Sequence, residues 1–281
     1  MGVGSNDISG ISTVGVFLAG RACSDTLFHM VAGAYGHPAI TEERAAMPFA
    51  GGILQHGYQC GMIWGSALAA GAQAHRRFGP GPRAQAAAVT AAAKAVECFR
   101  YLNDGRRDCF DITELDETSS KMRMVTYFLL KGGTIGCFRR AARYAPAAFR
   151  AIESALSADP AAPPPPVASC AAVLAHRMGA SDLHQTMVSG LAGGIGLSGG
   201  GCGALGAAIW LAGMDILKQH GGKLAFKDPK TTDVLERYLK AADYRFECSE
   251  IVGRTFQDVV DHAAWVRSGG CAGILEALAS G

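Results

Sequence analysis

The stretch that decides the fold runs from residue 191 to residue 207 and reads LAGGIGLSGGGCGALGA. An earlier stretch, residues 49–65, reads FAGGILQHGYQCGMIWG. Both contain Ala-Gly-Gly-Ile ahead of a Cys-Gly pair, with the second glycine eight residues before the cysteine. Glycine permits positive φ and close approach to a ligand, and a thiolate at a helix start is favoured by free backbone N–H groups. We therefore predict the same unit twice, a glycine-rich loop whose cysteine opens a helix.

The cysteines repeat along with this unit. Eight of the nine form two sets of four, spaced by 37, 49 and 28 residues in the first set and by 32, 46 and 23 in the second. The first set is Cys23, Cys60, Cys109 and Cys137, and the second is Cys170, Cys202, Cys248 and Cys271. Arg100-Tyr101-Leu102 and Arg237-Tyr238-Leu239 also match in the same order. The pattern predicts a tandem duplication, with Cys98 left over as a buried spare thiol.

A proline-rich segment separates the two sets. Residues 160–166 hold five prolines, which cannot continue a helix. We predict a first domain over residues 1–157, a stiff linker over 158–167 and a second domain over 168–281. Both halves are rich in alanine and lack alternating strands, so we predict an all-α fold of two homologous helical bundles related by pseudo-twofold symmetry. The helices are expected at 7–35, 41–50, 59–77, 83–103, 111–129, 138–156, 168–178, 181–192, 202–220, 230–241, 249–266 and 271–279.

Composition excludes several classes of function. A net charge of +2 and a pI near 8.1, without runs of basic and aromatic residues, argue against nucleic-acid binding. Residues 45–74 and 187–214 are free of charge, but their glycines, and Pro48 in the first, predict core segments instead of membrane spans. With no secretory signal evident, we expect a cytoplasmic protein. In a reducing compartment the thiols indicate a metal, a cluster or redox chemistry, not structural disulfides.

The cysteine pattern leaves several chemistries open. Four thiolates suit a [2Fe–2S] or a [4Fe–4S] cluster. Structural zinc is an alternative, although zinc sites usually contain close Cys-x-x-Cys pairs, which this chain lacks. Thiol–disulfide chemistry is another, and buried thiols acting as small hydrophobes are a third. His29 and His176 both lie six residues after the first cysteine of their set. On a helix they face away from it, so we expect hydrogen-bonded histidines, not ligands.

The chain resembles the redox-active C-GCAxxG-C-C family. Cys60-Gly61-Met62-Ile63-Trp64-Gly65 keeps both motif glycines, with Met62 in place of alanine. Cys202-Gly203-Ala204-Leu205-Gly206-Ala207 keeps the alanine but ends on Ala207. The resemblance covers essentially the whole chain as two copies, with the proline-rich linker between them, and implies an iron–sulfur centre, with [2Fe–2S] favoured over [4Fe–4S]. A related domain occurs in split-Soret cytochromes c, but this chain has no Cys-x-x-Cys-His motif for a c-type haem.

These observations predict an iron–sulfur redox protein for electron transfer or redox sensing. Each set of four cysteines would hold one cluster, and the partner would be an oxidoreductase or another electron donor or acceptor. The alternatives are a metal- or thiol-dependent enzyme acting on a small molecule, and a zinc-binding structural module. The protein would be a monomer that imitates a dimer of single-copy relatives, or a homodimer. No catalytic residue and no substrate pocket can be assigned from the sequence.

Overall fold

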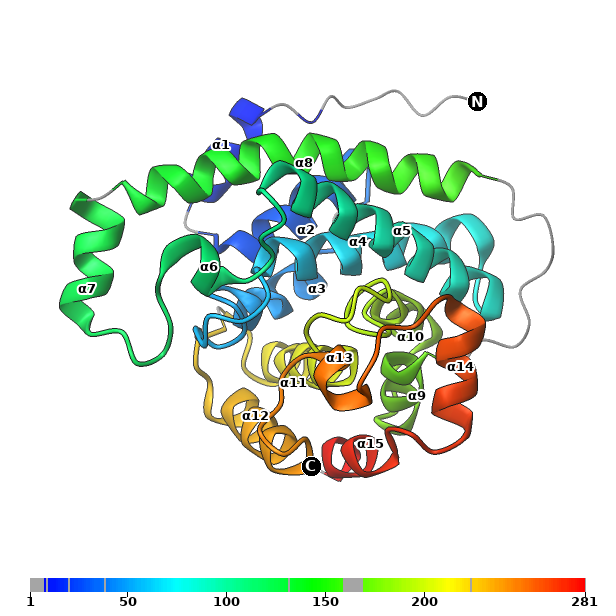
Figure 1. Ribbon diagram of the computed structural model, residues 1–281. Helices are drawn as coiled ribbons and strands as arrows, with labels where there is room; N and C mark the ends of the chain where they lie inside the picture. Colours follow the sequence, from blue (N-terminus) through cyan, green and yellow to red (C-terminus); the bar gives the residue numbers. More distant parts are fainter. Residues whose placement is uncertain are drawn as a thin grey trace.

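The computed structural model describes residues 8, 10–19, 21–37, 39–130, 132–158, 169–222 and 224–280. Its regular structure is helical, which confirms the all-α prediction (Figure 1). The first half contains α1 (Gly10–Leu18), α2 (Cys23–Ala34), α3 (Ile40–Ala45), η1 (Met47–Phe49), α4 (Gly61–Phe78), α5 (Pro82–Leu102), α6 (Cys109–Thr113), α7 (Lys121–Val125), η2 (Thr126–Leu130) and α8 (Gly133–Ser157). The second half contains α9 (Cys170–Arg177), α10 (Asp182–Ser189), α11 (Gly203–His220), α12 (Pro229–Ala241), α13 (Cys248–Val252), α14 (Val259–Arg267) and α15 (Ala272–Ala279).

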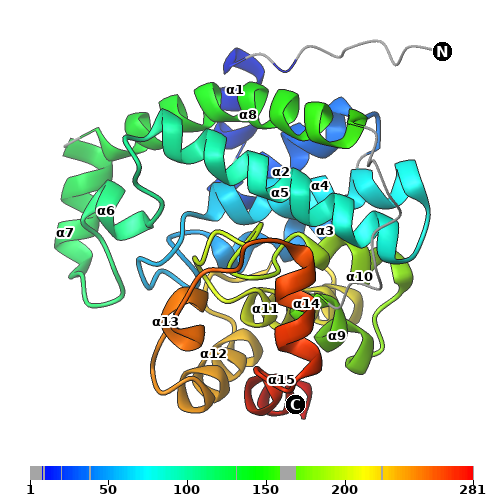
Figure 2. The same ribbon diagram turned by 45° about the vertical axis from the view of Figure 1, so that its right-hand side comes forward.

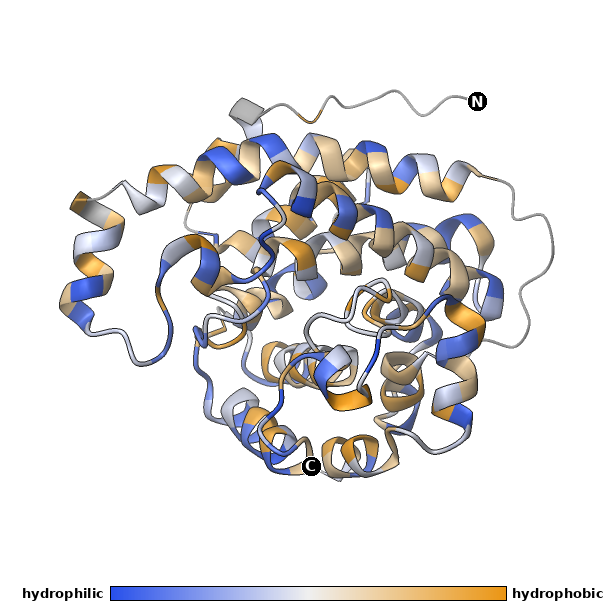
Figure 3. Ribbon diagram, viewed as in Figure 1, coloured by the Kyte–Doolittle hydropathy of each residue, from blue (hydrophilic) through white to orange (hydrophobic). Residues whose placement is uncertain are grey.

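The first half packs around α4, which contacts α2 and α5, while the long α8 crosses α5, α1 and α2 on the outside (Figure 1). In the second half α11 is the central helix, surrounded by α9, α12 and α15, and α14 lies outside it (Figure 2). Helices α8 and α12 alternate hydrophilic and hydrophobic residues along their length, as expected of helices with one buried face (Figure 3). Both central helices follow the glycine-rich loops identified in the sequence.

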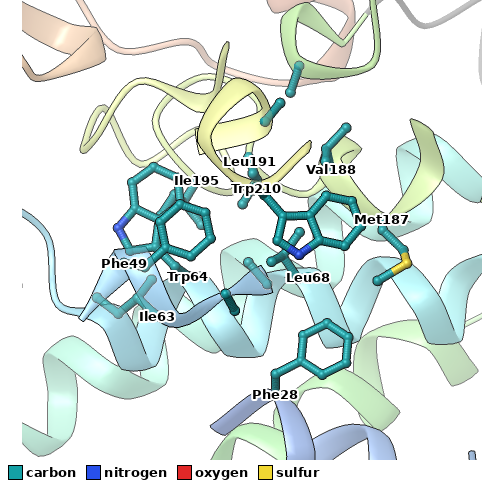
Figure 4. Packing of buried hydrophobic residues seen from close by; sticks show 14 of the residues in the cluster. Phe28, Phe49, Ile63, Trp64, Leu68, Met187, Val188, Leu191, Ile195 and Trp210 are labelled. Carbon is teal, nitrogen blue, oxygen red and sulfur yellow. The ribbon is translucent and has the colours of Figure 1, made fainter. Parts of the chain in front are cut away.

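One hydrophobic core runs through both halves. Trp64 and Leu68 of α4 lie in the same cluster as Trp210 of α11 and Met187 of α10 (Figure 4). Small residues allow this approach, because a Cβ on Gly206 would overlap the Trp64 ring. Helix α10 packs against α4 and α5, and α11 packs against α3. Whether each half also folds as a domain of its own stays a prediction, and residues 159–168 of the expected linker lie outside the described residues.

Four predicted helices are interrupted, and the one expected at 41–50 is divided into α3 and η1. The one expected at 7–35 is two, because Ala22 is extended (φ −80°, ψ 172°) and α2 begins only at Cys23. The one expected at 111–129 ends at Glu114, which adopts the left-handed conformation (φ 56°). The one expected at 249–266 ends at Gly253, also left-handed (φ 78°). A left-handed residue ends a helix because it turns the chain away from the helix axis. The helical spacing of apolar residues can continue across such a residue, so the pattern alone does not reveal the break.

The structure also corrects one detail of the predicted duplication. Tyr101 is 86% exposed, whereas its proposed counterpart Tyr238 is fully buried. Phe99, two residues earlier, is fully buried as Tyr238 is. Arg106 and Arg245 each donate to the carbonyl oxygen five residues ahead, which fits a register in which Phe99 corresponds to Tyr238. The duplication itself and the pseudo-twofold relation stay predictions.

In the part of the chain that the structure describes, no helix has the length and apolarity needed to cross a membrane.

Candidate metal centres

Seven of the eight repeated cysteines lie at the start of a helix. Cys60, Cys202 and Cys271 are the N-cap residues of α4, α11 and α15, and four more are the first residues of α2, α6, α9 and α13, namely Cys23, Cys109, Cys170 and Cys248. Cys137 alone lies inside a helix, since α8 begins at Gly133. Free N–H groups at a helix start can donate to sulfur, and this placement supplies them to most of the thiols.

The thiols of the first set lie close together. Cys23, Cys109 and Cys137 line one cavity, and negative charge on these three thiols would raise the pKa of the buried Cys60. The glycine after Cys60 is required for this approach. A Cβ on Gly61 would lie 2.9 Å from Cys23 Sγ and 2.8 Å from the carbonyl oxygen of Phe49. The Cys-Gly pair of the motif thus lets α2 and α4 bring their cysteines together. We refer to these four residues as the first quartet.

The second set converges in the same way. A small cavity of about 10 Å³ is lined by all four of its cysteines, Cys170, Cys202, Cys248 and Cys271. Ile251, Val252, Phe256, His262 and Ile274 also line this cavity. Space of this size holds about one water-sized sphere, so the second quartet is closed around its centre.

Matching backbone hydrogen bonds hold each quartet. The N–H of Cys60 donates to Arg107 O (2.9 Å), and that of Cys109 donates to Tyr58 O (2.8 Å). In the second half the N–H of Cys202 donates to Phe246 O (3.2 Å), and that of Cys248 donates to Gly200 O (2.7 Å). Each pair of bonds ties the end of a glycine-rich loop to the start of a short helix more than 40 residues later. These hydrogen bonds hold the segments that carry the second and third cysteines of each half side by side.

Several donors point at the sulfur atoms. Backbone N–H groups of Gly51 and Met62 donate to Cys23 and Cys60, and those of Gly193 and Leu205 donate to Cys170 and Cys202. In the second quartet, Trp265 Nε1 also donates to Cys271 Sγ (3.3 Å). This indole donor could not be predicted from the sequence, because the turn between α14 and α15 determines whether Trp265 reaches Cys271. Donors of this kind stabilise anionic sulfur.

Burial dominates the ionisation of all eight thiols. It raises the pKa of Cys109 to about 12, and raises the pKa values of the other seven as well. Neighbouring sulfurs raise several of these pKa values further, whereas Arg140 lowers those of Cys109 and Cys137. Without a cation among them the thiols are therefore neutral. A reactive thiol needs a lowered pKa, so this environment argues against thiol nucleophiles and suits metal ligands that lose their protons on binding.

The two quartets differ in what surrounds them. Cys23, Cys109 and Cys137 open onto a cavity of about 470 Å³ whose walls are mainly apolar. We did not foresee this cavity from the sequence, because its walls come from α1, η2, α8 and the loop before α12. The available signal was a large apolar residue two positions after a glycine, as in Phe17 after Gly15 and Phe138 after Gly136.

The repeated histidines and Cys98 do not line either of the two cysteine-lined cavities. His29 Nδ1 pairs with Glu43 Oε2 (3.0 Å), as expected of a hydrogen-bonded histidine, and His176 is exposed. His56, which precedes Cys60 by four residues, pairs with Glu117 Oε2 (3.1 Å). Cys98 is a half-buried free thiol on α5.

Comparison with known families supports the interpretation of the first half. Residues 21–138 match the family model described as "Putative redox-active protein (C_GCAxxG_C_C)". This segment is similar to that family. The match contains the whole first quartet and ends one residue after Cys137. No curated protein and no solved structure matches the chain. The second quartet lies outside the matched segment, so its relation to the C_GCAxxG_C_C family rests on the repeated residues and hydrogen bonds alone.

Proposed function

We propose that this protein is an iron–sulfur redox protein, with one cluster held by each cysteine quartet. The observation that carries the proposal is the convergence of eight cysteines, far apart in sequence, into two buried groups of four. The C_GCAxxG_C_C family supports a redox role for the first half. A bound cluster would supply one-electron transfer, and the protein would contribute ligands, burial and hydrogen bonds to sulfur that set the potential.

The donor set fits a cluster better than a single ion. Among the described residues, no three Cys, His, Asp or Glu side chains gather closely enough to hold one metal ion. Structural zinc needs four ligands about 2.3 Å from one point, whereas a cluster distributes four thiolates over two or more irons. Because the chain also lacks the close Cys-x-x-Cys pairs that are usual in zinc sites, we favour a cluster, with [2Fe–2S] preferred through the resemblance to the family and [4Fe–4S] as the alternative.

A second candidate is an enzyme that uses the first centre on a small molecule. The cavity of about 470 Å³ beside Cys23, Cys109 and Cys137 favours it, because a pure electron carrier needs no such space. The second quartet would then pass electrons to the first. The two halves are in direct contact through the stacked rings of Tyr58 and Phe246, whose centroids are 3.6 Å apart.

Anaerobic purification with analysis of iron, acid-labile sulfide and visible absorbance tests the proposal. We expect coloured protein with iron and sulfide in equal amounts. Cys60→Ser and Cys202→Ser should each remove about half of the iron and colour if the sites are independent, while the control Cys98→Ser should remove none. Colourless protein that contains zinc, or no metal, would overturn the assignment. Complete loss from either single variant would show that the two quartets form one centre.

A further inference from the structure

The cavity at the first quartet has the size and walls of a ligand site. Its volume of about 470 Å³ lies within the range of small-molecule pockets. The sulfur atoms occupy one part of the wall, and hydrophobic side chains make up most of the rest. These side chains are Phe17, Leu18, Ala50, Leu115, Met124, Phe128, Phe138 and Phe226. Phe17 and Phe138 form a tilted ring pair with centroids 4.7 Å apart, so aromatic groups from two helices share this wall.

Apolar side chains are also left exposed around the cavity. Leu18 is 65% exposed, Phe128 is 41% exposed and Phe226 is 39% exposed. They come from α1, from η2 and from the loop before α12, which are separate segments of the chain. The turn η2 is a π-helix, a conformation that often marks functional sites. Exposed apolar residues from three segments, gathered at one cavity, indicate a place where an apolar molecule enters.

The charged groups that line the cavity are already paired. Arg21 donates to Glu43 Oε2 (2.9 Å), and Asp116 Oδ1 accepts from the hydroxyls of Thr118 (2.8 Å) and Ser119 (3.1 Å). The lining hydroxyls are also used, since Thr113 donates to Cys109 O and Thr134 donates to Phe128 O. An anionic ligand would therefore lose its hydration without gaining a free positive charge, because Arg21 is paired with Glu43, and the carboxylate of Asp116 would repel it.

The second quartet has no equivalent space. Phe256 and His262 pack edge to face, with ring centroids 4.8 Å apart, and both line its cavity of about 10 Å³. Phe256 is buried, and Trp265 of α14 donates to Cys271 from the same side. In the first half α7 and η2 occupy the corresponding segment between the third and fourth cysteines, and there the cavity stays open. The two sites are therefore specialised differently, although their cysteines are held alike.

We propose that the cavity beside Cys23, Cys109 and Cys137 binds an uncharged, largely apolar small molecule with an aromatic or alkyl body. Binding places this molecule against the sulfur atoms of the first quartet. The inference goes beyond electron transfer and does not depend on the cluster, because the apolar walls and the paired charges are features of the protein alone. The second quartet, closed by Phe256 and His262, binds no such ligand.

Fluorescence titration with N-phenyl-1-naphthylamine, a neutral apolar probe, tests the proposal on the purified full-length protein. We expect one saturable site per chain. Phe128→Glu in η2 and Leu18→Glu in α1 should each weaken binding by about tenfold or more, since they place a charge in the apolar space. Leu130→Glu is the matched control, because Leu130 lies in η2, is 81% exposed and does not line the cavity. It should change the affinity by less than about twofold.

Two further measurements keep the test decisive. Circular dichroism and the unfolding midpoint establish that each variant is folded, and Leu18→Glu alone carries the test if Phe128→Glu unfolds. The anionic analogue 1-anilinonaphthalene-8-sulfonate should bind about tenfold more weakly than the neutral probe. Absence of saturable binding, equal effects of Leu18→Glu and Leu130→Glu, or equal affinity for the two probes would each overturn the proposal. Iron content is measured separately, so its loss would contradict the cluster without contradicting the ligand site.

Discussion

Gln59 Oε1 accepts a hydrogen bond from the backbone N–H of Gly201 at 2.6 Å. Each of these residues directly precedes a cysteine, Cys60 in one case and Cys202 in the other. Gln59 is fully buried, and a Cβ on Gly200 or Gly201 would press against its side chain. One side chain therefore fixes the spacing of the two cysteine-bearing loops, and any movement of one loop affects the other.

Replacing Gln59 with leucine should destabilise the protein by about 1–3 kcal/mol, because it leaves the buried N–H of Gly201 without an acceptor. Chemical denaturation followed by circular dichroism measures this loss. Gln219→Leu, on the exposed surface of α11, serves as control and should shift the free energy of unfolding by less than about 0.5 kcal/mol. Equal stability of the two variants would show that the bond does not hold the halves together.

The last glycine of the first motif should be irreplaceable. A Cβ on Gly65 would overlap the carbonyl oxygen of Ser24, in the first turn of α2. Gly65→Ala should therefore cost about 1–3 kcal/mol of unfolding free energy through overpacking. Gly33→Ala, on α2 with open space around it, should instead stabilise the helix by up to about 1 kcal/mol. Thermal unfolding of both variants compares the two, and a Gly65→Ala protein as stable as Gly33→Ala would contradict the packing argument.

Glu43 should make the protein sensitive to acid. Burial raises the pKa of its carboxyl, but hydrogen bonds from His29 and Arg21 outweigh this and hold the pKa below the ordinary value. A carboxyl with a lowered folded-state pKa stabilises the protein above its unfolded pKa of about 4.3, and this stabilisation is lost as pH falls through the folded pKa.

Glu43→Gln should lower the free energy of unfolding at pH 7 by about 1–3 kcal/mol and flatten its decline below about pH 4.3. Unfolding midpoints between pH 3 and pH 7 measure both effects. The control is Glu97→Gln, whose salt bridge with Lys94 is exposed, and it should leave the profile nearly unchanged. If stability declined with pH in parallel for the wild type and Glu43→Gln, Glu43 would not be the source of the acid sensitivity.

Trp265 should tune only the second centre. Its indole N–H donates to Cys271 Sγ, and donors to sulfur raise the potential of a cluster. Trp265→Phe keeps an aromatic ring there without the donor, so we expect a lower potential for the second centre and an unchanged first centre. Redox titration followed by electron paramagnetic resonance separates the two signals. A shift in both signals, or in neither, would contradict this role.

Arg140 should tune only the first centre. Its charge lowers the pKa values of Cys109 and Cys137, which burial raises. Removing a positive charge makes it harder to add an electron, so Arg140→Gln should lower the potential of the first centre by roughly 45 mV, equivalent to about 1 kcal/mol. Arg143→Gln, on the same helix, is the control, and the same redox titration measures all three proteins. An equal shift from Arg143→Gln would mean that the effect is one of general surface charge.

The positions of some cysteines at helix starts could be predicted from the sequence, because the residues next to them along the chain determine where those helices begin. A cysteine after a glycine-rich loop lies at a helix start in both halves, as Cys60 and Cys202 do, since glycine and the end of a helix leave local signatures. The all-α fold followed from composition in the same way. The breaks at Glu114 and before Cys23 did not, because single residues with unusual φ and ψ angles carry little signal of their own.

What the sequence determined by itself was the set of thiols, their order and the helix starts at Cys60 and Cys202, because these depend on neighbours along the chain. The tertiary structure decided everything that needs distant segments to meet. Gln59 reaches Gly201, and Phe17, Phe128 and Phe226 gather around one cavity while Phe256 lines the other. Such contacts depend on the packing of whole helices, so two nearly matching cysteine patterns became one open site and one closed site.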